Sequence, residues 1–128
     1  MSNRHYRWMY CADSIVSVAM KLETMGYGIH GHDIRIKLCL CSTTPAAIDV
    51  EELKRVISEI TGSLTHKPLW EVVGKNEALI EDLLILIRDL TLQRINSRSG
   101  KMDVCLIRGI TGSGVEISLT SSTCTNAI

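Results

Sequence analysis

The sequence predicts an α+β fold in which one antiparallel four-stranded sheet carries two helices packed on one face. Three observations lead to this prediction. Apolar and polar residues alternate over residues 32–41, apolar residues recur at helical spacing over residues 49–62 and 76–93, and residues 102–108 and 114–120 form two apolar runs around a glycine-rich turn. Helices that share one face of a sheet bury all of these apolar surfaces in a single core.

The first third of the chain is predicted to contain two strands and a short helix. Residues 4–12 (RHYRWMYCA) are rich in Tyr and Trp, as strands are. Residues 13–25 are predicted to be helical, because Asp13 or Ser14 can cap the start and Gly26 can end it, with helical spacing at Ile15, Ala19 and Leu22. The alternation over residues 32–41 predicts a half-buried strand, with one apolar face made by Ile34, Ile36, Leu38 and Leu40.

Two amphipathic helices and a hairpin follow. The apolar stripe of residues 49–62 ends at Gly62. The helix over residues 76–93 is predicted to begin at Asn76, and its apolar sector, widened by Leu84 and Leu92, predicts burial on two sides, as at a subunit contact. With the closing hairpin, and leaving the short helix aside, the predicted order is β-β-α-α-β-β.

Composition limits the possible functions. The chain has 128 residues, with 14 Lys and Arg against 14 Asp and Glu, so residues 1–128 are predicted to form one domain of balanced charge. This balance and the low aromatic content of 4% argue against nucleic acid as a partner. With no apolar run of membrane-spanning length and no signal-peptide core, we expect a cytoplasmic protein without a membrane partner.

The five cysteines occur at irregular spacing, at Cys11, Cys39, Cys41, Cys105 and Cys124. Their odd number and the absence of a C-x-x-C pair argue against both a disulfide framework and a zinc ribbon. Cys39 and Cys41 lie two residues apart, so they share one face of a strand and are predicted to be small buried apolar residues. A metal pair or a redox site is the alternative.

The segment His30-Gly31-His32 leads into the strand at residues 32–41. Two residues apart on a strand, both imidazoles project from the same face, the one that continues as Ile34 and Ile36. Neutral imidazole is a good zinc ligand, and a catalytic zinc takes three protein ligands with one open position. The pair predicts either part of a metal site or two histidines of a turn.

Five blocks in order resemble the 6-pyruvoyltetrahydropterin synthase family, which includes 6-carboxytetrahydropterin synthase. The blocks cover roughly residues 8–120. They are Tyr10-Cys11-Ala12-Asp13-Ser14 for Phe-x-Ala-x-His, HGHDIRIKLCL for HGHNY with alternating valines, Ala47-Ile48-Asp49-Val50-Glu51-Glu52-Leu53-Lys54 at a helix start, Leu64-Thr65-His66-Lys67-Pro68-Leu69-Trp70 for Leu-Asp-His-Lys-x-Leu-Asn, and Lys75-Asn76-Glu77-Ala78-Leu79 for Thr-x-Glu-Asn-Leu.

The resemblance implies the tunnelling fold, a trimer or hexamer, zinc, and a carbon–oxygen lyase acting on a pterin-like small molecule. It implies His30 and His32 as metal ligands and His66 as the catalytic proton carrier. It also offers Glu77 and Arg108 as substrate-binding candidates.

Four positions depart from the family's pattern. Ser14 occupies the third zinc-ligand position, and no cysteine precedes His30 where the family has its catalytic thiol. Thr65 replaces the aspartate that orients the imidazole of the next residue, and Arg108 replaces the glutamate that anchors the pterin. The charge reversal at Arg108 would repel the hydrogen-donating pterin edge.

Two functions therefore stay open. One is a zinc-assisted lyase of altered specificity, in which His30 and His32 hold the metal and His66 shuttles protons. The other is a non-catalytic member of the family that keeps the fold and the oligomer as a binding or structural module. In either case Arg108, with Arg35 and Lys37, forms a solvated basic face or a pocket for an anionic ligand.

Overall fold

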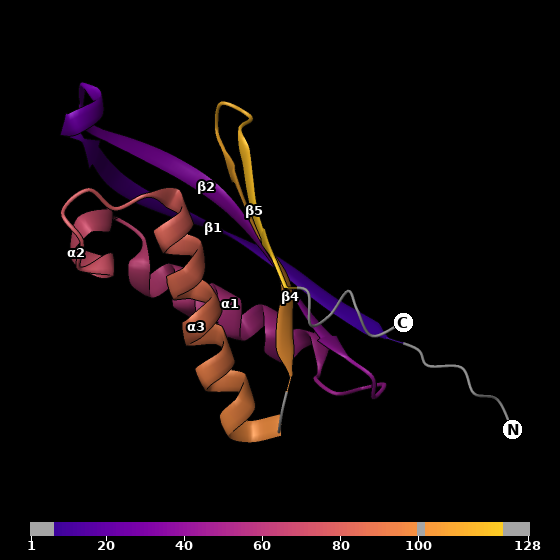
Figure 1. The fold of residues 1–128 in the computed structure, drawn as a ribbon. Coiled ribbons are helices and arrows are strands. Elements are labelled where there is room, and N and C mark those ends of the chain that lie inside the picture. Colours follow the sequence, from indigo (N-terminus) through magenta and orange to yellow (C-terminus); the bar gives the residue numbers. More distant parts are fainter. Residues whose placement is uncertain (1–6, 100–101, 122–128) are drawn as a thin grey trace, which may run out of the picture.

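A computed structural model describes residues 7–99 and 102–121 and contains one sheet with three helices (Figure 1). His5 and Cys124 lie outside the described residues. The strands follow the order β3-β1-β2-β4-β5 across the sheet. The elements are β1 (Trp8–Leu22), the 3-10 turn η1 (Glu23–Met25), β2 (Tyr27–Ser42), α1 (Val50–Leu64), β3 (Lys67–Pro68), α2 (Leu69–Val73), α3 (Ile80–Ser99), β4 (Asp103–Thr111) and β5 (Glu116–Thr120).

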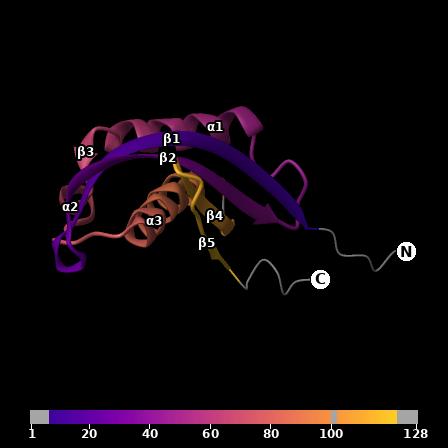
Figure 2. The same cartoon turned by 90° about the horizontal axis from the view of Figure 1, so that it is seen from above.

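The long hairpin of β1 and β2 replaces the short helix predicted over residues 13–25, and that prediction is wrong. The two strands pair antiparallel from Trp8 opposite Ser42 to Met20 opposite His30, and they curve together as one ribbon (Figure 2). Burial along β1 follows a period of two, with Val16, Val18 and Met20 all buried. Pairing with β2 and the β-branched side chains of Val16 and Val18 outweigh the weak helical spacing, because strand preference depends on tertiary context.

The two faces of the sheet differ in character. The apolar alternation of β2 is confirmed, since Ile34, Ile36, Leu38 and Leu40 are fully buried under the helices, opposite Val16 and its even-numbered neighbours on β1. We call this side the helix face. The opposite side, the free face, carries the pairs Cys11–Cys39, Asp13–Lys37, Ile15–Arg35 and Ser17–Asp33.

The sheet has five strands and is mixed, so the predicted antiparallel four-stranded sheet is wrong both in the number of strands and in their direction. The additional strand, β3, is only two residues long and runs parallel to β1, with Lys67 opposite Val18 and Pro68 opposite Ala19. A segment this short gives no alternation from which it could be predicted. The predicted closing hairpin is confirmed as β4 and β5.

The helix over residues 49–62 is confirmed as α1, whereas the second helix begins later than predicted. It starts at Ile80 rather than Asn76, and the Asp82 carboxylate accepts a hydrogen bond from the backbone N–H of Leu79 at 2.8 Å. Residues 69–73 form the separate short helix α2, which ends at Gly74 with a φ of 76°. Within the described residues, no helix is long and apolar enough to cross a membrane.

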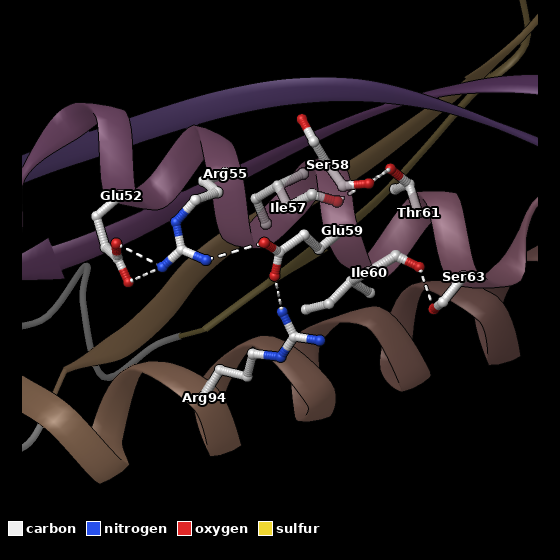
Figure 3. Close-up of polar contacts among 9 residues, drawn as sticks. All are labelled: Glu52, Arg55, Ile57, Ser58, Glu59, Ile60, Thr61, Ser63 and Arg94. Atoms are coloured by element: carbon white, nitrogen blue, oxygen red, sulfur yellow. Dashed lines mark hydrogen bonds and ion pairs between the residues drawn. The ribbon is translucent and has the colours of Figure 1, made fainter.

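An ion pair between Glu59 and Arg94 joins the exposed sides of α1 and α3, and two further pairs lie within α1 (Figure 3). Glu59 accepts hydrogen bonds from Arg55 at 2.9 Å and from Arg94 of α3 at 2.6 Å, and Arg55 also contacts Glu52 at 2.6 Å. The hydrogen bonds from Arg55 and Arg94 lower the pKa of Glu59 below its ordinary value. The Arg94–Glu59 pair therefore links the two helices on the side away from the sheet.

A disulfide joins Cys11 of β1 to Cys39 of β2, directly opposite each other on the free face. The prediction that Cys39 and Cys41 are buried is confirmed, with exposures of 0% and 4%. The prediction that cysteine spacing indicates no disulfide is wrong, because pairing depends on the register of the two strands. Cys105 is a buried free thiol whose pKa is raised by burial.

Candidate functional site

His30 and His32 lie side by side near the closed end of the β1–β2 hairpin. Their ring centres are 4.8 Å apart with the planes at 82°, and both residues are half-buried. His30 Nδ1 donates a hydrogen bond to the carbonyl oxygen of Gly28 at 2.8 Å, which orients the ring. The predicted pair of imidazoles on one face is therefore present.

The positions that face these imidazoles on β1 are apolar. Met20 is directly opposite His30 and Val18 is directly opposite His32, and each is only 3% exposed. Ser14, the expected third-ligand position, is opposite Ile36. It lies four residues before Val18, which is about 13 Å along β1 from the residue that faces His32. The position that the resemblance aligned with the third ligand therefore lies too far along β1 to share an ion with the two histidines.

Ser14 and Asp13 have other contacts. The hydroxyl of Ser14 lies 2.8 Å from that of Thr61 on α1, on the helix face. Asp13 lies on the free face with Arg35 at 3.8 Å, and Lys54 donates to the Asp13 carbonyl. Neither side chain can join His30 and His32 at one ion.

A three-ligand zinc site is not supplied by these residues. Among the described residues no group of three His, Cys, Asp or Glu side chains is arranged to hold a metal. His30 and His32 provide two of the three protein ligands that a catalytic zinc usually takes. Zinc at this position therefore stays a prediction.

His66 lies on the other side of β1 from His32. It directly precedes β3 and has a φ of 64°, and its backbone N–H donates to the Ser17 carbonyl at 2.6 Å. The Thr65 hydroxyl accepts from the Ser17 N–H at 2.8 Å. Thr65, which replaces the family's aspartate, therefore fastens the segment to the edge of β1.

Ser17 also positions a carboxylate that the sequence analysis did not identify. Its hydroxyl donates to Asp33 Oδ1 at 2.6 Å on the free face. Ser17 thereby connects the His66 segment on one side to Asp33 of β2 on the other. The alternation of β1 could have revealed this pair only if residues 13–22 had been assigned to a strand.

An open pocket of about 380 Å³ brings together two of the three predicted histidines. Its small residues Ala19 and Gly31 leave room above the backbone. It is lined by Ser17, Val18, Ala19, Gly31, His32, Asp33 and His66. The pocket therefore offers imidazole, hydroxyl and carboxylate groups to a small molecule.

Glu77 and Arg108 do not line this pocket. Glu77 accepts hydrogen bonds from Thr24, from the backbone N–H at 2.8 Å and from the hydroxyl at 2.9 Å, and so ties the loop before α3 to the hairpin end. Both views place α2 beside the same hairpin end (Figures 1 and 2). In the structure Glu77 is a positioning residue for this corner of the fold.

Arg108 lies on the free face opposite Lys37, about 16 Å along β2 from His32. It pairs with the carboxylate of Glu116, with Nε to Oε1 at 3.8 Å, and Nε is buried without a hydrogen-bond partner among the described residues. Within one chain the charge reversal at Arg108 is therefore separate from the histidines.

Taken together, the sheet order, the long hairpin and the helices on one face define an α+β protein with the fold of a pterin synthase. Among solved structures, the 6-pyruvoyl tetrahydropterin synthase of Caenorhabditis elegans is similar, with a TM-score of 0.71 over 94% of this chain and 99% of that protein, at 17% sequence identity. This likeness confirms the fold that the sequence blocks implied. No protein-family model and no curated protein matches the sequence.

Proposed function

We propose that this chain is a divergent pterin-synthase-like protein that binds a small molecule without carrying out the pterin synthase reaction. The observation that supports binding is the pocket shared by His32, His66 and Asp33. The imidazole of His66 and the second carboxylate oxygen of Asp33 are groups that can hydrogen-bond a polar ligand.

Three features argue against the family's own reaction. The segment before His30 contains no thiol, and the position of the aspartate is filled by Thr65, whose hydroxyl is already bonded to Ser17. The apolar side chains of Val18 and Met20 face the two metal-ligand candidates. A general acid–base mechanism needs a positioned proton acceptor, and this chain lacks the two that the family uses.

Two measurements test the proposal together. We expect no turnover of dihydroneopterin triphosphate, and sustained product formation would overturn this part. Neopterin, titrated by its own fluorescence, probes the pocket, and its affinity should fall at least about tenfold in His66→Ala and in Asp33→Asn if these groups contact it. Glu71→Gln, an exposed change on α2, is the matched control, and equal affinity in all variants would contradict the pocket assignment.

The second candidate is a zinc-assisted lyase of altered specificity. The adjacent rings of His30 and His32 favour it, because two imidazoles bound to one ion also have centres about 5 Å apart. In this case His66 would move a proton at the pocket edge. Stoichiometric zinc in untagged protein, lost in His30→Ala, would support it.

We also propose a homo-oligomer, either a trimer or a hexamer, located in the cytoplasm. The 15-residue β1 pairs with β3 at only two positions, so much of its outer edge lies beyond β3. Light scattering should give a mass of three or six times 14.2 kDa. A monomer at micromolar concentration would contradict this proposal.

A further inference from the structure

We propose that Cys11 is a site of reversible modification by a small thiol of the glutathione type, which opens the Cys11–Cys39 disulfide and stays on Cys11 as a mixed disulfide. The proposal does not depend on the small-molecule function, since the disulfide lies toward the open end of the β1–β2 hairpin and the pocket toward its closed end. It follows from the unequal exposure of the two cysteines and from the side chains around Cys39.

The two halves of the disulfide differ in access. Cys11 and Cys39 are directly opposite each other, yet Cys11 is exposed whereas Cys39 is 0% exposed. The sheet order explains this difference, because β2 is paired along this stretch with β4, whereas the described neighbour of β1 on its outer side is β3, at Val18 and Ala19. A thiolate must reach the sulfur that it attacks, so the attack is directed to Cys11 Sγ.

The exchange needs no oxidant or reductant other than the small thiol. Its thiolate forms a bond with Cys11 Sγ, and the bond between the two cysteines breaks with its electron pair on Cys39 Sγ. The proton that the small thiol loses is balanced by the proton that Cys39 gains. One disulfide is thereby exchanged for another, and Cys39 becomes a thiol within the sheet.

The surroundings of Cys39 favour it as the leaving group. Cys39 lies in a buried cluster with Cys41 and Cys105. Arg7 places a guanidinium nitrogen 3.6 Å from Cys41 Sγ, and its Nε is buried without a hydrogen-bond partner among the described residues. A cation stabilises a thiolate that forms nearby, and a buried donor without an acceptor gains from a new anion.

Cys105 is the competing nucleophile inside the protein. Its thiol donates to the carbonyl oxygen of Cys39 at 3.4 Å. Burial raises the pKa of Cys105, which keeps it as the thiol rather than the reactive thiolate. An attack by Cys105 would move the link to Cys39 without adding mass, so the two reactions are separable by mass spectrometry.

The test is peptide mapping after the folded, oxidised protein is incubated with reduced glutathione and its free thiols are alkylated. Trypsin leaves Cys11 in residues 8–21 and Cys39 in residues 38–54. We expect glutathione on Cys11 at least about tenfold more often than on Cys39. Glutathione mainly on Cys39, a new Cys39–Cys105 link, or a disulfide that stays intact in the folded protein while urea-unfolded protein reacts would overturn the proposal.

Two matched variants test access without the disulfide, with oxidised glutathione as the reagent. In Cys39→Ala the Cys11 thiolate takes one half of the reagent and releases one reduced glutathione, and in Cys11→Ala only Cys39 can do so at this position. We expect modification of Cys11 to be at least about tenfold faster than that of Cys39. Equal rates would contradict the access argument, and circular dichroism verifies that both variants keep the fold.

A stability measurement reports the consequence of the modification. Wild-type protein that carries glutathione on Cys11 should unfold at a lower urea concentration than the unmodified protein, close to that of Cys11→Ala, because both lack the covalent link between β1 and β2. A midpoint equal to that of the unmodified protein would mean that opening the link has no effect on the fold and would overturn its role as a reversible constraint.

Discussion

At the scale of single residues, His66 occupies a backbone conformation that costs free energy. A φ of 64° places it in the left-handed region, where a residue with a Cβ is less stable than glycine by about 1 kcal/mol. Its backbone N–H is bonded to Ser17 and its side chain is exposed at the pocket. The backbone bond explains the conformation, and ligand binding is the proposed role of the imidazole.

Replacing His66 separates these two contributions. We expect His66→Gly to keep or raise the free energy of unfolding by up to about 1 kcal/mol, because glycine adopts this φ without steric cost. His66→Val should lower it by about 1–2 kcal/mol. Urea unfolding measures both changes, and a loss of stability in His66→Gly would show that the imidazole itself stabilises the fold.

The register of the hairpin makes a second prediction about single residues. Met20→His should create a third imidazole opposite His30 and raise the affinity for Zn²⁺ by at least about tenfold, because three histidines match a common zinc ligand set. Ser14→His should not, since this position is opposite Ile36. Isothermal titration with Zn²⁺ compares the two variants. Tighter binding in Ser14→His alone would mean that the register differs from the one described.

The candidate site could be predicted from the sequence only in part. His30, His32 and His66 belong to recognisable blocks, and the pocket does bring His32 and His66 together. Asp33 was missed because its role depends on which residue of β1 lies opposite which residue of β2. Cross-strand neighbours are set by the turn and its bulge, which residue spacing alone does not determine.

At the scale of elements, the packing of α3 on β4 depends on a residue without a side chain. A Cβ at Gly109 would lie 3.1 Å from Ile34 Cγ2 and 3.3 Å from Leu84 Cδ2. Ile34 and Leu84 are almost completely buried, so neither can move away easily. Gly109 therefore sets how closely the helix approaches the sheet.

Two glycine-to-alanine variants test this close approach. Gly109→Ala should destabilise the protein by about 1–3 kcal/mol through overpacking. Gly62→Ala, in the exposed last turn of α1 with nothing within 4 Å of the added Cβ, should stabilise it by about 0.5–1 kcal/mol. Thermal unfolding of both variants gives the comparison, and an unchanged Gly109→Ala would show that α3 can shift without cost.

The ion pairs between α1 and α3 make a pH-dependent contribution. Because the pKa of Glu59 is lower in the folded state, its contribution is present above the unfolded value of about 4.3 and is lost as the pH falls through the folded value. Arg94→Ala should raise the pKa of Glu59. The free energy of unfolding of this variant should approach that of the wild type at acid pH, where Glu59 is protonated in both proteins. NMR titration of the Glu59 carboxyl measures the pKa. Arg88→Ala, whose partner Asp89 is the next residue, serves as the control.

Elements with a strong repeat were predicted well, and those that depend on context were not. The strand at residues 32–41 and the helix at 49–62 have one clear period each, and both are present. Residues 13–25 carry both a helical spacing and a period of two, and only the neighbouring β2 decides between them. α2 and β3 are too short to show any period.

At the scale of the whole molecule, the fold follows from the sequence more completely than the site does, because a single core of aliphatic side chains tolerates divergence that a constellation of polar groups does not.

The Cys11–Cys39 disulfide closes 28 residues of chain, which contain the hairpin end and both candidate metal ligands. A covalent link of this kind stabilises mainly by restricting the unfolded chain.

Removing the disulfide should therefore weaken the whole domain without changing its topology. We expect Cys11→Ala to lower the free energy of unfolding by about 2–4 kcal/mol while the circular dichroism spectrum is kept. Urea unfolding without reductant is the measurement, and Ile15→Ala, an exposed change on the same face of β1, is the control. Equal stability of Cys11→Ala and wild type would mean that the disulfide is not formed in solution.

The outer edge of β1 has a consequence for solubility. Lys54 bonds the carbonyl of Asp13, while Thr65 and His66 bond the amide and carbonyl of Ser17, so side chains and loops already occupy this edge from Asp13 onward. A foreign strand therefore meets groups that already bond the backbone around Asp13 and Ser17. Colloidal behaviour should therefore respond more to a charge change at Met9 than to one near Ser17, even though both belong to one continuous strand.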